Sequence, residues 1–248
     1  MSKRSRSEYR PGLLARSLWP VTSYLVTNLS VVLLWVLFFV LNRTTVHGRR
    51  NVGDRRNTLL IANHQSMIDS FLIGMGVYFP RSLIRPHLLP WNPAATENFF
   101  RGWLRAWLAY NWRCIPVREG RRDPRTLLRM TEVLPDGVMI LFPEGTRTRD
   151  GSVGPGRPGA GMVALATGAR VIPVAIDGMR DVLPIGSHLP RIGKRIHVWY
   201  GPPLPGSATP APVPRREEAQ QLVDRAMAAI RDQLAAIRRR DVPVAQGG

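Results

Sequence analysis

Cysteine is nearly absent from this 248-residue sequence, which contains only Cys114. A lone cysteine excludes an intrachain disulfide framework and any zinc site built from several cysteines, and this scarcity is typical of a reducing compartment. We interpret Cys114 as a buried packing residue, because the chain offers it no resolving cysteine. The length suits one well-buried domain with appendages and is too short for two ordinary domains.

Acidic residues are also scarce, with 17 Asp and Glu against 35 Lys and Arg and a formal net charge of +18. An excess of this size favours an anionic partner, which means nucleic acid or anionic lipid before anything else. Composition alone does not choose between these two partners.

Charge is missing altogether between Ser17 and Asn42, whereas residues 1–16 form a basic tail. A helix over these 26 residues would be about 39 Å long, enough to span a hydrocarbon core of about 30 Å with tilt. Its first half carries Thr and Ser, so an interfacial helix or a bent re-entrant pair is equally consistent. No cleavage pattern of a signal peptide follows. We therefore predict an uncleaved membrane anchor over 17–42, with a buried core helix as the alternative.

Beyond the anchor, short apolar runs alternate with segments of helical spacing. The runs predict strands at Thr58–Ala62, Cys114–Val117, Val138–Phe142, Val171–Ile176 and Ile196–Tyr200. Helices are expected at Phe71–Phe79, Phe99–Tyr110, Pro124–Leu134 and Gly161–Thr167. This alternation predicts an α/β fold, a single domain over residues 43–214 with a mixed, mostly parallel central sheet flanked by helices.

The C-terminal part begins with a proline-rich linker over 202–214 and continues as an amphipathic helix, predicted at Arg215–Arg240, before a short tail at 241–248. One side of this helix is an apolar stripe of Val223, Met227, Ile230, Leu234 and Ile237. The stripe can dock on the domain, on a membrane or on a second subunit, and the pattern does not separate these.

A histidine and a carboxylate follow the first predicted strand, in the stretch Asn63 to Asp69. A carboxylate on one ring nitrogen holds a histidine in the tautomer that accepts a proton on the other nitrogen, so His64 and Asp69 are candidates for a general base and its orienting acid. The nucleophile motif Gly-x-Ser-x-Gly is absent, so the substrate must supply the attacking group. The competing interpretation is a histidine in a turn with Asp69 as an ordinary helix cap.

A second polar cluster, 144–149, follows the strand at Val138–Phe142. Its glycine, threonines and arginines are suited to hold a phosphate through backbone N–H groups and guanidinium groups. Arg118 and Arg157 follow other elements of the same sheet and are expected to converge on the same anion. An acid such as Glu144 fits a phosphate site if it orients an arginine or receives a substrate hydroxyl.

Taken together, these segments resemble the glycerolipid acyltransferases, in particular the 1-acylglycerol-3-phosphate acyltransferase group. Four blocks carry the resemblance, in the family's order: Asn63-His64 with Asp69, Ile115-Pro116-Val117-Arg118, Phe142-Pro143-Glu144-Gly145-Thr146-Arg147 and Val171-Ile172-Pro173-Val174. The sequence departs from the family at Val117, where an acid is frequent, and at Arg85, near which many members have a lysine. These departures concern the acceptor and not the acyl-transfer chemistry.

The resemblance implies transfer of a fatty acyl group from acyl-CoA or acyl carrier protein to the hydroxyl of 1-acylglycerol 3-phosphate, giving phosphatidic acid. It implies that His64 is the general base and Asp69 its orienter, that no metal or bound cofactor takes part, and that the enzyme works at a membrane from the cytoplasmic side. The candidate substrate-binding residues are Arg118, Glu144, Gly145, Thr146, Arg147 and Arg157.

Two alternatives remain at this stage. The same chemistry can serve another acceptor: glycerol 3-phosphate, another lysophospholipid or a lyso-aminolipid. A membrane-anchored nucleic-acid-binding protein would explain the charge and the interleaved aromatic residues, but it leaves His64, Asp69 and Glu144 without a role. We therefore expect lipid partners and no nucleic acid.

Overall fold

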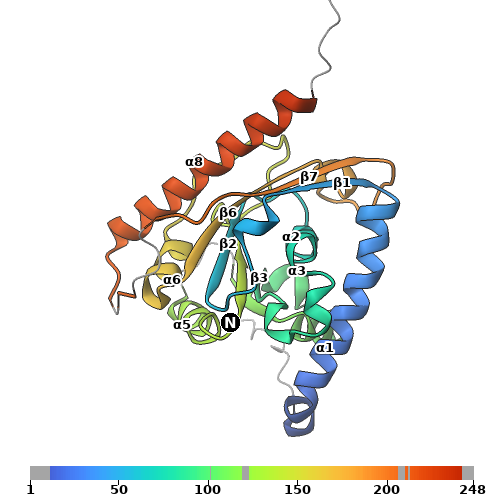
Figure 1. Cartoon of the computed structure of the whole chain (residues 1–248). Coiled ribbons are helices and arrows are strands. Elements are labelled where there is room, and N and C mark those ends of the chain that lie inside the picture. The colour runs from blue at the N-terminus through green and yellow to red at the C-terminus, as the bar shows by residue number, and fades with distance from the viewer. Residues whose placement is uncertain (1–11, 101, 119–122, 206–209, 212, 242–248) are drawn as a thin grey trace, which may run out of the picture.

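The computed structural model describes residues 12–100, 102–118, 123–205, 210–211 and 213–241, and it is built around a five-stranded sheet (Figure 1). The order across the sheet is β1 (Arg43–His47), β7 (Arg195–Tyr200), β6 (Arg170–Asp177), β2 (Thr58–Ala62) and β5 (Val138–Leu141). The strands β6, β2 and β5 are parallel to one another, β7 is antiparallel to β6, and β1 is parallel to β7. The predicted mixed, mostly parallel sheet is confirmed.

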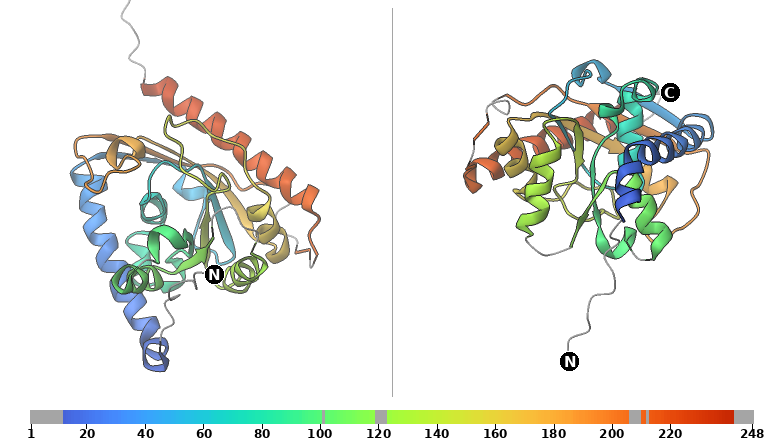
Figure 2. Two further views of the ribbon diagram at one scale, coloured as in Figure 1. Left: turned by 180° about the vertical axis from the view of Figure 1, so that it is seen from behind. Right: turned by 90° about the horizontal axis from the view of Figure 1, so that it is seen from below.

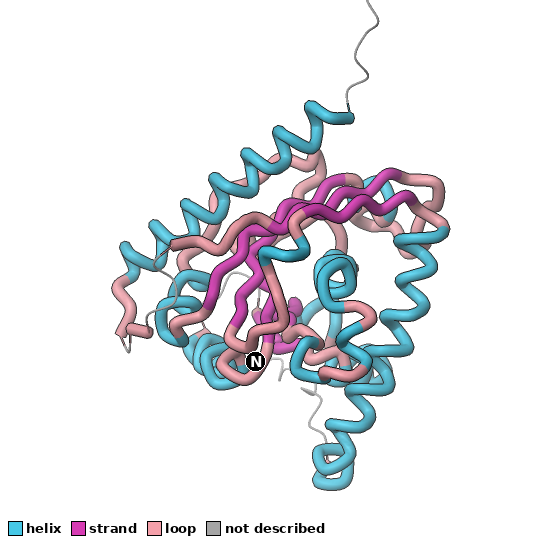
Figure 3. Tube along the Cα trace, in the orientation of Figure 1, coloured by secondary structure: helices cyan, strands magenta, loops and turns pink. Residues whose placement is uncertain are grey.

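Helices cover both faces of the sheet, which forms a single twisted layer between them (Figure 3). Successive strand residues point to opposite faces, so Leu60 of β2 joins one core while Leu59 and Ile61 join the other. The first core includes α1 (Leu13–Trp35) and α2 (Asp69–Tyr78). The second core is closed by α5 (Pro124–Val133), α6 (Gly159–Thr167) and α8 (Arg216–Asp241). All five residues of β2 are buried, as its unbroken apolar run predicts.

The amphipathic helix α8 lies along the second core and is part of the fold. All five residues of its predicted stripe, Val223, Met227, Ile230, Leu234 and Ile237, are buried against the domain. At its start the helix approaches α6 so closely that a side chain on Gly161 would overlap the carbonyl oxygen of Ala219. Of the three roles considered for the apolar stripe, the structure therefore confirms that it docks on the domain.

The helix α1 passes the side of the domain opposite to α8, as both views in Figure 2 show. It begins at Leu13, inside the segment predicted as a basic tail, and continues as a π-helix over Val36–Val40. The combined helix over residues 13–40 is long and apolar enough to cross a membrane. Its polar side faces the protein, where Ser23 and Thr27 both donate hydrogen bonds to the carbonyl oxygen of Asn111. The rest of the predicted tail lies outside the described residues.

Some predicted elements differ from the structure. The strand β4 (Cys114–Val117) is not in the central sheet: it pairs with β3 (Asn92–Ala95) in a two-stranded sheet, which approaches β5 through a bridge between Trp91 and Met139. The helix expected at Phe99–Tyr110 begins only at Trp103, as α4 (Trp103–Asn111), after Gly102 with φ of 79°; a separate short helix, α3 (Thr96–Phe99), precedes it. Burial raises the pKa of Cys114 to about 12, so its thiol stays protonated, in keeping with a packing role.

Short helical elements complete the fold. They are α7 (Met179–Val182) and three turns of 3₁₀-helix at Arg49–Asn51, Arg81–Leu83 and Pro86–Leu88. The edge strand β1 is also absent from the prediction, because its sequence Arg-Thr-Thr-Val-His is too polar to stand out as an apolar run.

Candidate active site

Three parallel strands end at the same edge of the sheet, and each one delivers polar residues there. The chain after β2 carries His64, the chain after β5 carries Glu144, and β6 ends at Asp177. Because β2 lies between β6 and β5, the loop with His64 is flanked on both sides. A loop cluster at the carboxyl ends of parallel strands is where open α/β sheets place their ligands.

His64 and Asp69 form a hydrogen-bonded pair, as predicted, with 2.9 Å between His64 Nδ1 and Asp69 Oδ2. The same oxygen accepts the backbone N–H groups of Gln65 at 2.6 Å and Ser66 at 2.8 Å. Asp69 is completely buried and opens α2, where the positive end of the helix dipole favours a carboxylate. This arrangement places the ring proton on Nδ1 and leaves Nε2 as a proton acceptor.

The backbone on either side of His64 is held by two buried amide side chains. Asn63 pairs with the backbone of Ile176 in both directions, donating at 2.9 Å and accepting at 2.8 Å. Gln65 donates to Asp177 at 3.1 Å and accepts the N–H of Met179 at 3.0 Å. Both amides are fully buried. They fix the loop to the end of β6 and restrict the positions that His64 can take.

Asp177 extends this network to the C-terminal helix. Arg238 of α8 approaches both of its carboxylate oxygens, at 3.0 and 3.3 Å, and also donates to the carbonyl oxygen of Gly151 at 2.8 Å. Burial alone would raise the pKa of Asp177, but the hydrogen bonds from Arg238 and Gln65 outweigh it and lower the pKa. The carboxylate therefore stays ionised and joins α8 to the loop that carries His64.

Glu144 braces the same loop from the side of β5. Its Oε1 accepts the backbone N–H of His64 and its Oε2 accepts that of Gly154, each at 3.0 Å. Burial raises the pKa of Glu144, while these two hydrogen bonds oppose the rise. Thr148 donates its N–H to the carbonyl oxygen of His64 at 2.9 Å, and the His64 ring stacks on Phe142 with 4.0 Å between ring centroids. Both backbone groups of His64 are thus occupied.

The predicted phosphate-binding residues are brought together only in part. Gly145 has φ of 71°, and a side chain there would lie 3.4 Å from the guanidinium carbon of Arg157, so Arg157 lies against this turn. Thr146 is exposed and Arg147 is half-buried beside them. Arg118 follows β4 in the two-stranded sheet, where its charge acts on Asp123. The expected convergence therefore holds for Arg157 with the Gly145 turn, while that of Arg118 stays a prediction.

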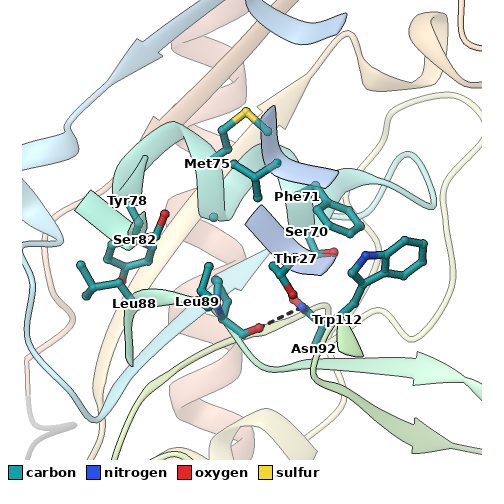
Figure 4. A pocket seen from close by; sticks show the side chains of 13 residues that line it. Thr27, Ser70, Phe71, Met75, Tyr78, Ser82, Leu88, Leu89, Asn92 and Trp112 are labelled. Carbon is teal, nitrogen blue, oxygen red and sulfur yellow. Dashed lines mark hydrogen bonds between the residues drawn. The ribbon is translucent and has the colours of Figure 1, made fainter. Parts of the chain in front are cut away.

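A small cavity lies between α1, α2 and the segment that leads into β3 (Figure 4). Phe71 and Met75 of α2, Thr27 of α1 and Trp112 line it, with Asn92 donating to the carbonyl oxygen of Pro90 at 3.2 Å. Its volume of about 30 Å³ leaves room for a water molecule and not for a lipid chain.

With this geometry in place, comparison with known proteins identifies the family. A model of the family described as Acyltransferase matches residues 43–177. The chain belongs to the acyltransferase family. The matched range contains the His64–Asp69 pair, Glu144 and the whole of β2, β5 and β6.

The chain is also similar to individual members of the family. It is 28% identical over 151 residues to a chloroplastic 1-acyl-sn-glycerol-3-phosphate acyltransferase of Brassica napus, covering 58% of this chain and 40% of that protein. It is 31% identical over 133 residues to a chloroplastic 1-acyl-sn-glycerol-3-phosphate acyltransferase of Arabidopsis thaliana, covering 51% of this chain and 33% of that protein. The chain thus spans less than half the length of these curated relatives. The fold matches the crystal structure of the 1-acyl-sn-glycerophosphate acyltransferase PlsC from Thermotoga maritima with a TM-score of 0.58 at 23% identity, over 90% of this chain and 84% of that one.

Proposed function

We propose that this acyltransferase moves a fatty acyl group from acyl-CoA or acyl carrier protein to the free hydroxyl of 1-acylglycerol 3-phosphate, giving phosphatidic acid. The observation that carries the proposal is the His64–Asp69 pair, in which Nδ1 is engaged by a buried carboxylate and Nε2 is left to act on a substrate. Within the described residues, no serine, threonine or cysteine side chain donates a hydrogen bond to the His64 ring. The choice of acceptor is supported by the similarity to 1-acyl-sn-glycerol-3-phosphate acyltransferases.

In the proposed reaction, His64 Nε2 takes the proton of the acceptor hydroxyl while the hydroxyl oxygen attacks the carbonyl carbon of the thioester. The tetrahedral intermediate then breaks its carbon–sulfur bond, and the imidazolium returns the proton to the departing thiolate. The products are an ester and a free thiol. Asp69 keeps Nδ1 protonated and stabilises the positive charge that the ring acquires. It thereby supports His64 as the general base.

For the acceptor phosphate we propose Arg147, Arg157 and the backbone of the Gly145 turn, with Arg118 and Thr146 at its margin. Neither Arg147 nor Arg157 forms an ion pair with a carboxylate of the described residues, so both guanidinium groups are available to an anion. For Glu144 we propose a role that differs from the acceptor contact implied by the family resemblance. Since both of its oxygens accept backbone N–H groups, we propose that it positions His64 and does not contact the acceptor.

We propose that α1 attaches the enzyme to the membrane surface by its outer side. Apolar side chains are exposed along that side, namely Leu14, Leu18, Val21, Leu25, Leu29 and Leu33. Exposed Ile84 and Trp103 belong to neighbouring elements, and Tyr24 of α1 donates to the carbonyl oxygen of Leu83, next to Ile84. Because the helix is bonded to the domain along its polar side, a position in the interface accounts for this amphipathic arrangement better than a free span does.

The activity is tested with the full chain in vesicles, defined lysolipids and either acyl-CoA or acyl carrier protein thioester, with phosphatidic acid measured by lipid analysis. We expect the 1-acylglycerol 3-phosphate acceptor to be preferred over glycerol 3-phosphate and over lysolipids with other headgroups. His64→Ala should lower turnover about 10²- to 10⁴-fold, the usual contribution of a general base. The matched control is His188→Ala, because His188 is an exposed loop histidine. Undiminished turnover in His64→Ala would contradict the mechanism.

Membrane attachment is tested separately by vesicle flotation. Replacing Leu25 and Leu29 together by glutamate places two charges on the exposed side of α1 and should release the protein from vesicles. The control is Leu128→Glu, an equally exposed leucine on α5, which covers the other face of the sheet. Release by the control variant to the same extent would remove α1 from its proposed role.

A further inference from the structure

A cleft of about 510 Å³ opens beside the loop that carries His64, and none of the residues proposed so far for substrate binding lines it. Part of the lining is next to His64: Gln65 follows it in sequence, and Thr148 donates its N–H to the carbonyl oxygen of His64. Another part of the lining comes from α7 and the chain that follows it. The lining residues are Gln65, Thr148, Arg149, Arg180, Asp181, Pro184, Ile185 and Arg191.

The charge of the cleft is strongly one-sided, with three guanidinium groups and a single carboxylate. Arg180 is partly engaged, since it donates to the carbonyl oxygen of Asp150 and lies 4.0 Å from Asp181. Arg149 and Arg191 form no ion pair with any carboxylate in the described part of the chain. Three arginines against one carboxylate in a concave site suit a phosphate, whose oxygens accept paired N–H groups.

The part of the lining that carries Arg191 is fixed to the rest of the fold. The backbone N–H of Arg191 donates to the carbonyl oxygen of Val182 at 2.7 Å, and its own carbonyl oxygen accepts the side-chain amide of Asn42 at 3.3 Å. Gln65 is held by Asp177 and by Met179, the first residue of α7. Both parts of the lining are therefore preorganised, which lowers the entropy that a ligand must remove on binding.

We propose that this cleft is a second anion site, which binds a phosphate group of one of the two co-substrates. The inference rests on the proposed acyl transfer, in which two molecules that both carry phosphate meet at His64. Two phosphate groups repel each other and need separate cationic cradles. Arg147 and Arg157 at the Gly145 turn form one cradle, and Arg149, Arg180 and Arg191 form the other.

The first experiment measures binding without catalysis, by titrating the full chain in a calorimeter with two probes. Glycerol 3-phosphate represents the headgroup of the acceptor, and adenosine 3′,5′-bisphosphate represents the phosphates of a coenzyme A donor. Arg191→Gln should weaken one of the two probes about tenfold, as expected for the loss of one charge-assisted contact, and leave the other unchanged. The affected probe identifies which co-substrate occupies the cleft.

The control variant is Arg216→Gln, which removes the same charge from an exposed position at the start of α8. Arg191→Lys, which keeps the charge, should recover part of the binding. The second experiment is steady-state kinetics, in which Arg191→Gln should raise KM for the co-substrate that matches the affected probe and leave kcat unchanged. Thermal unfolding of each variant verifies that the fold is intact.

The proposal is overturned if native protein binds neither probe, if Arg191→Gln binds both as native protein does, or if Arg216→Gln weakens binding equally. These outcomes are distinct from failure of the proposed function. That function fails if native protein forms no phosphatidic acid from any acceptor, whatever the calorimetry shows.

Discussion

Replacing Asp69 by asparagine tests the catalytic pair with the smallest change in shape. Asp69 Oδ2 accepts N–H groups from His64, Gln65 and Ser66, whereas Oδ1 has no hydrogen-bond partner among the described residues. The asparagine must therefore keep its oxygen at the Oδ2 position, because its NH₂ group would face three donors there. The NH₂ group then occupies the Oδ1 position, buried and without an acceptor.

The expected loss of stability follows from these contacts. A hydrogen bond to a charged acceptor contributes about 1.5–3 kcal/mol and a neutral one about 1 kcal/mol, so the three bonds together lose about 1.5–6 kcal/mol. A buried unpaired NH₂ group costs about 1–3 kcal/mol more. Relief of the desolvation cost of the carboxylate offsets most of this sum, as with other buried charges. We expect a net decrease in the free energy of unfolding of about 1–2 kcal/mol, small enough for the variant to fold.

The loss of activity should be far larger than this loss of stability. The imidazolium formed in the transition state would face a neutral amide in place of a carboxylate, which should lower kcat about 10²- to 10⁴-fold. The assay is phosphatidic acid formation at saturating concentrations of both co-substrates, with urea unfolding measured on the same preparation. Asp136→Asn is the control, since its side chain is 85% exposed. A kcat within threefold of native in Asp69→Asn would refute the role of the pair.

Three further predictions concern the contacts around the site. Arg238→Gln should lower the free energy of unfolding by about 1 kcal/mol in urea at neutral pH. The pKa of Asp177 is lowered in the folded state, so its ion pair with Arg238 stabilises the fold above the ordinary aspartate pKa of about 3.9. This stabilisation is lost as the pH falls through the folded pKa. The free energies of unfolding of variant and native protein should therefore converge in acid. Glu144→Gln should cost about 1–3 kcal/mol and lower kcat, because its NH₂ group meets one of two backbone N–H donors. Gly161→Ala should cost about 1–3 kcal/mol by thermal or urea unfolding, since its methyl group overlaps Ala219.

Two of these predictions have a matched control variant, and the third is checked by its pH dependence. Gly159→Ala lies on the same helix as Gly161 but has open space around it, so it should be tolerated; equal costs would contradict the proposed contact between α6 and α8. For Arg238→Gln, a stability loss that persists unchanged in acid would show that its ion pair is not the cause. Glu144→Asp keeps the charge but shortens the reach, and native activity in both Glu144 variants would remove the residue from its bracing role.

The architecture of the sheet could be read from the sequence because its strands are buried on both faces. Thr58–Ala62 and Val138–Leu141 are unbroken apolar runs, and in the structure every residue of both strands is buried. The same burial places the ends of these strands together, which is why the proximity of His64 and Glu144 followed from sequence. Strand β1 escaped prediction because it is an edge strand with polar residues.

The interior of the site could not be predicted in the same way. Gln65 lies next to His64 in sequence, but its partners Asp177 and Met179 are more than a hundred residues away, and no local pattern marks an amide that will be buried. The role that we propose for Glu144 differs from the one expected from sequence for a related reason. The residue type predicts a carboxylate near a phosphate site, whereas only the folded backbone shows that two N–H groups already occupy its oxygens.

The position of β7 affects which residues a recombinant fragment of this domain must include. The family model ends at residue 177, but β7 begins at Arg195 and separates β1 from β6 in the sheet. A recombinant fragment limited to 43–177 would contain β1 without the strand that it pairs with, and its second core would lack α8. Such a fragment would expose two unpaired strand edges and an apolar sheet face, so we expect it to aggregate during expression. Domain boundaries for this enzyme should therefore be drawn from strand order and not from the range of sequence similarity.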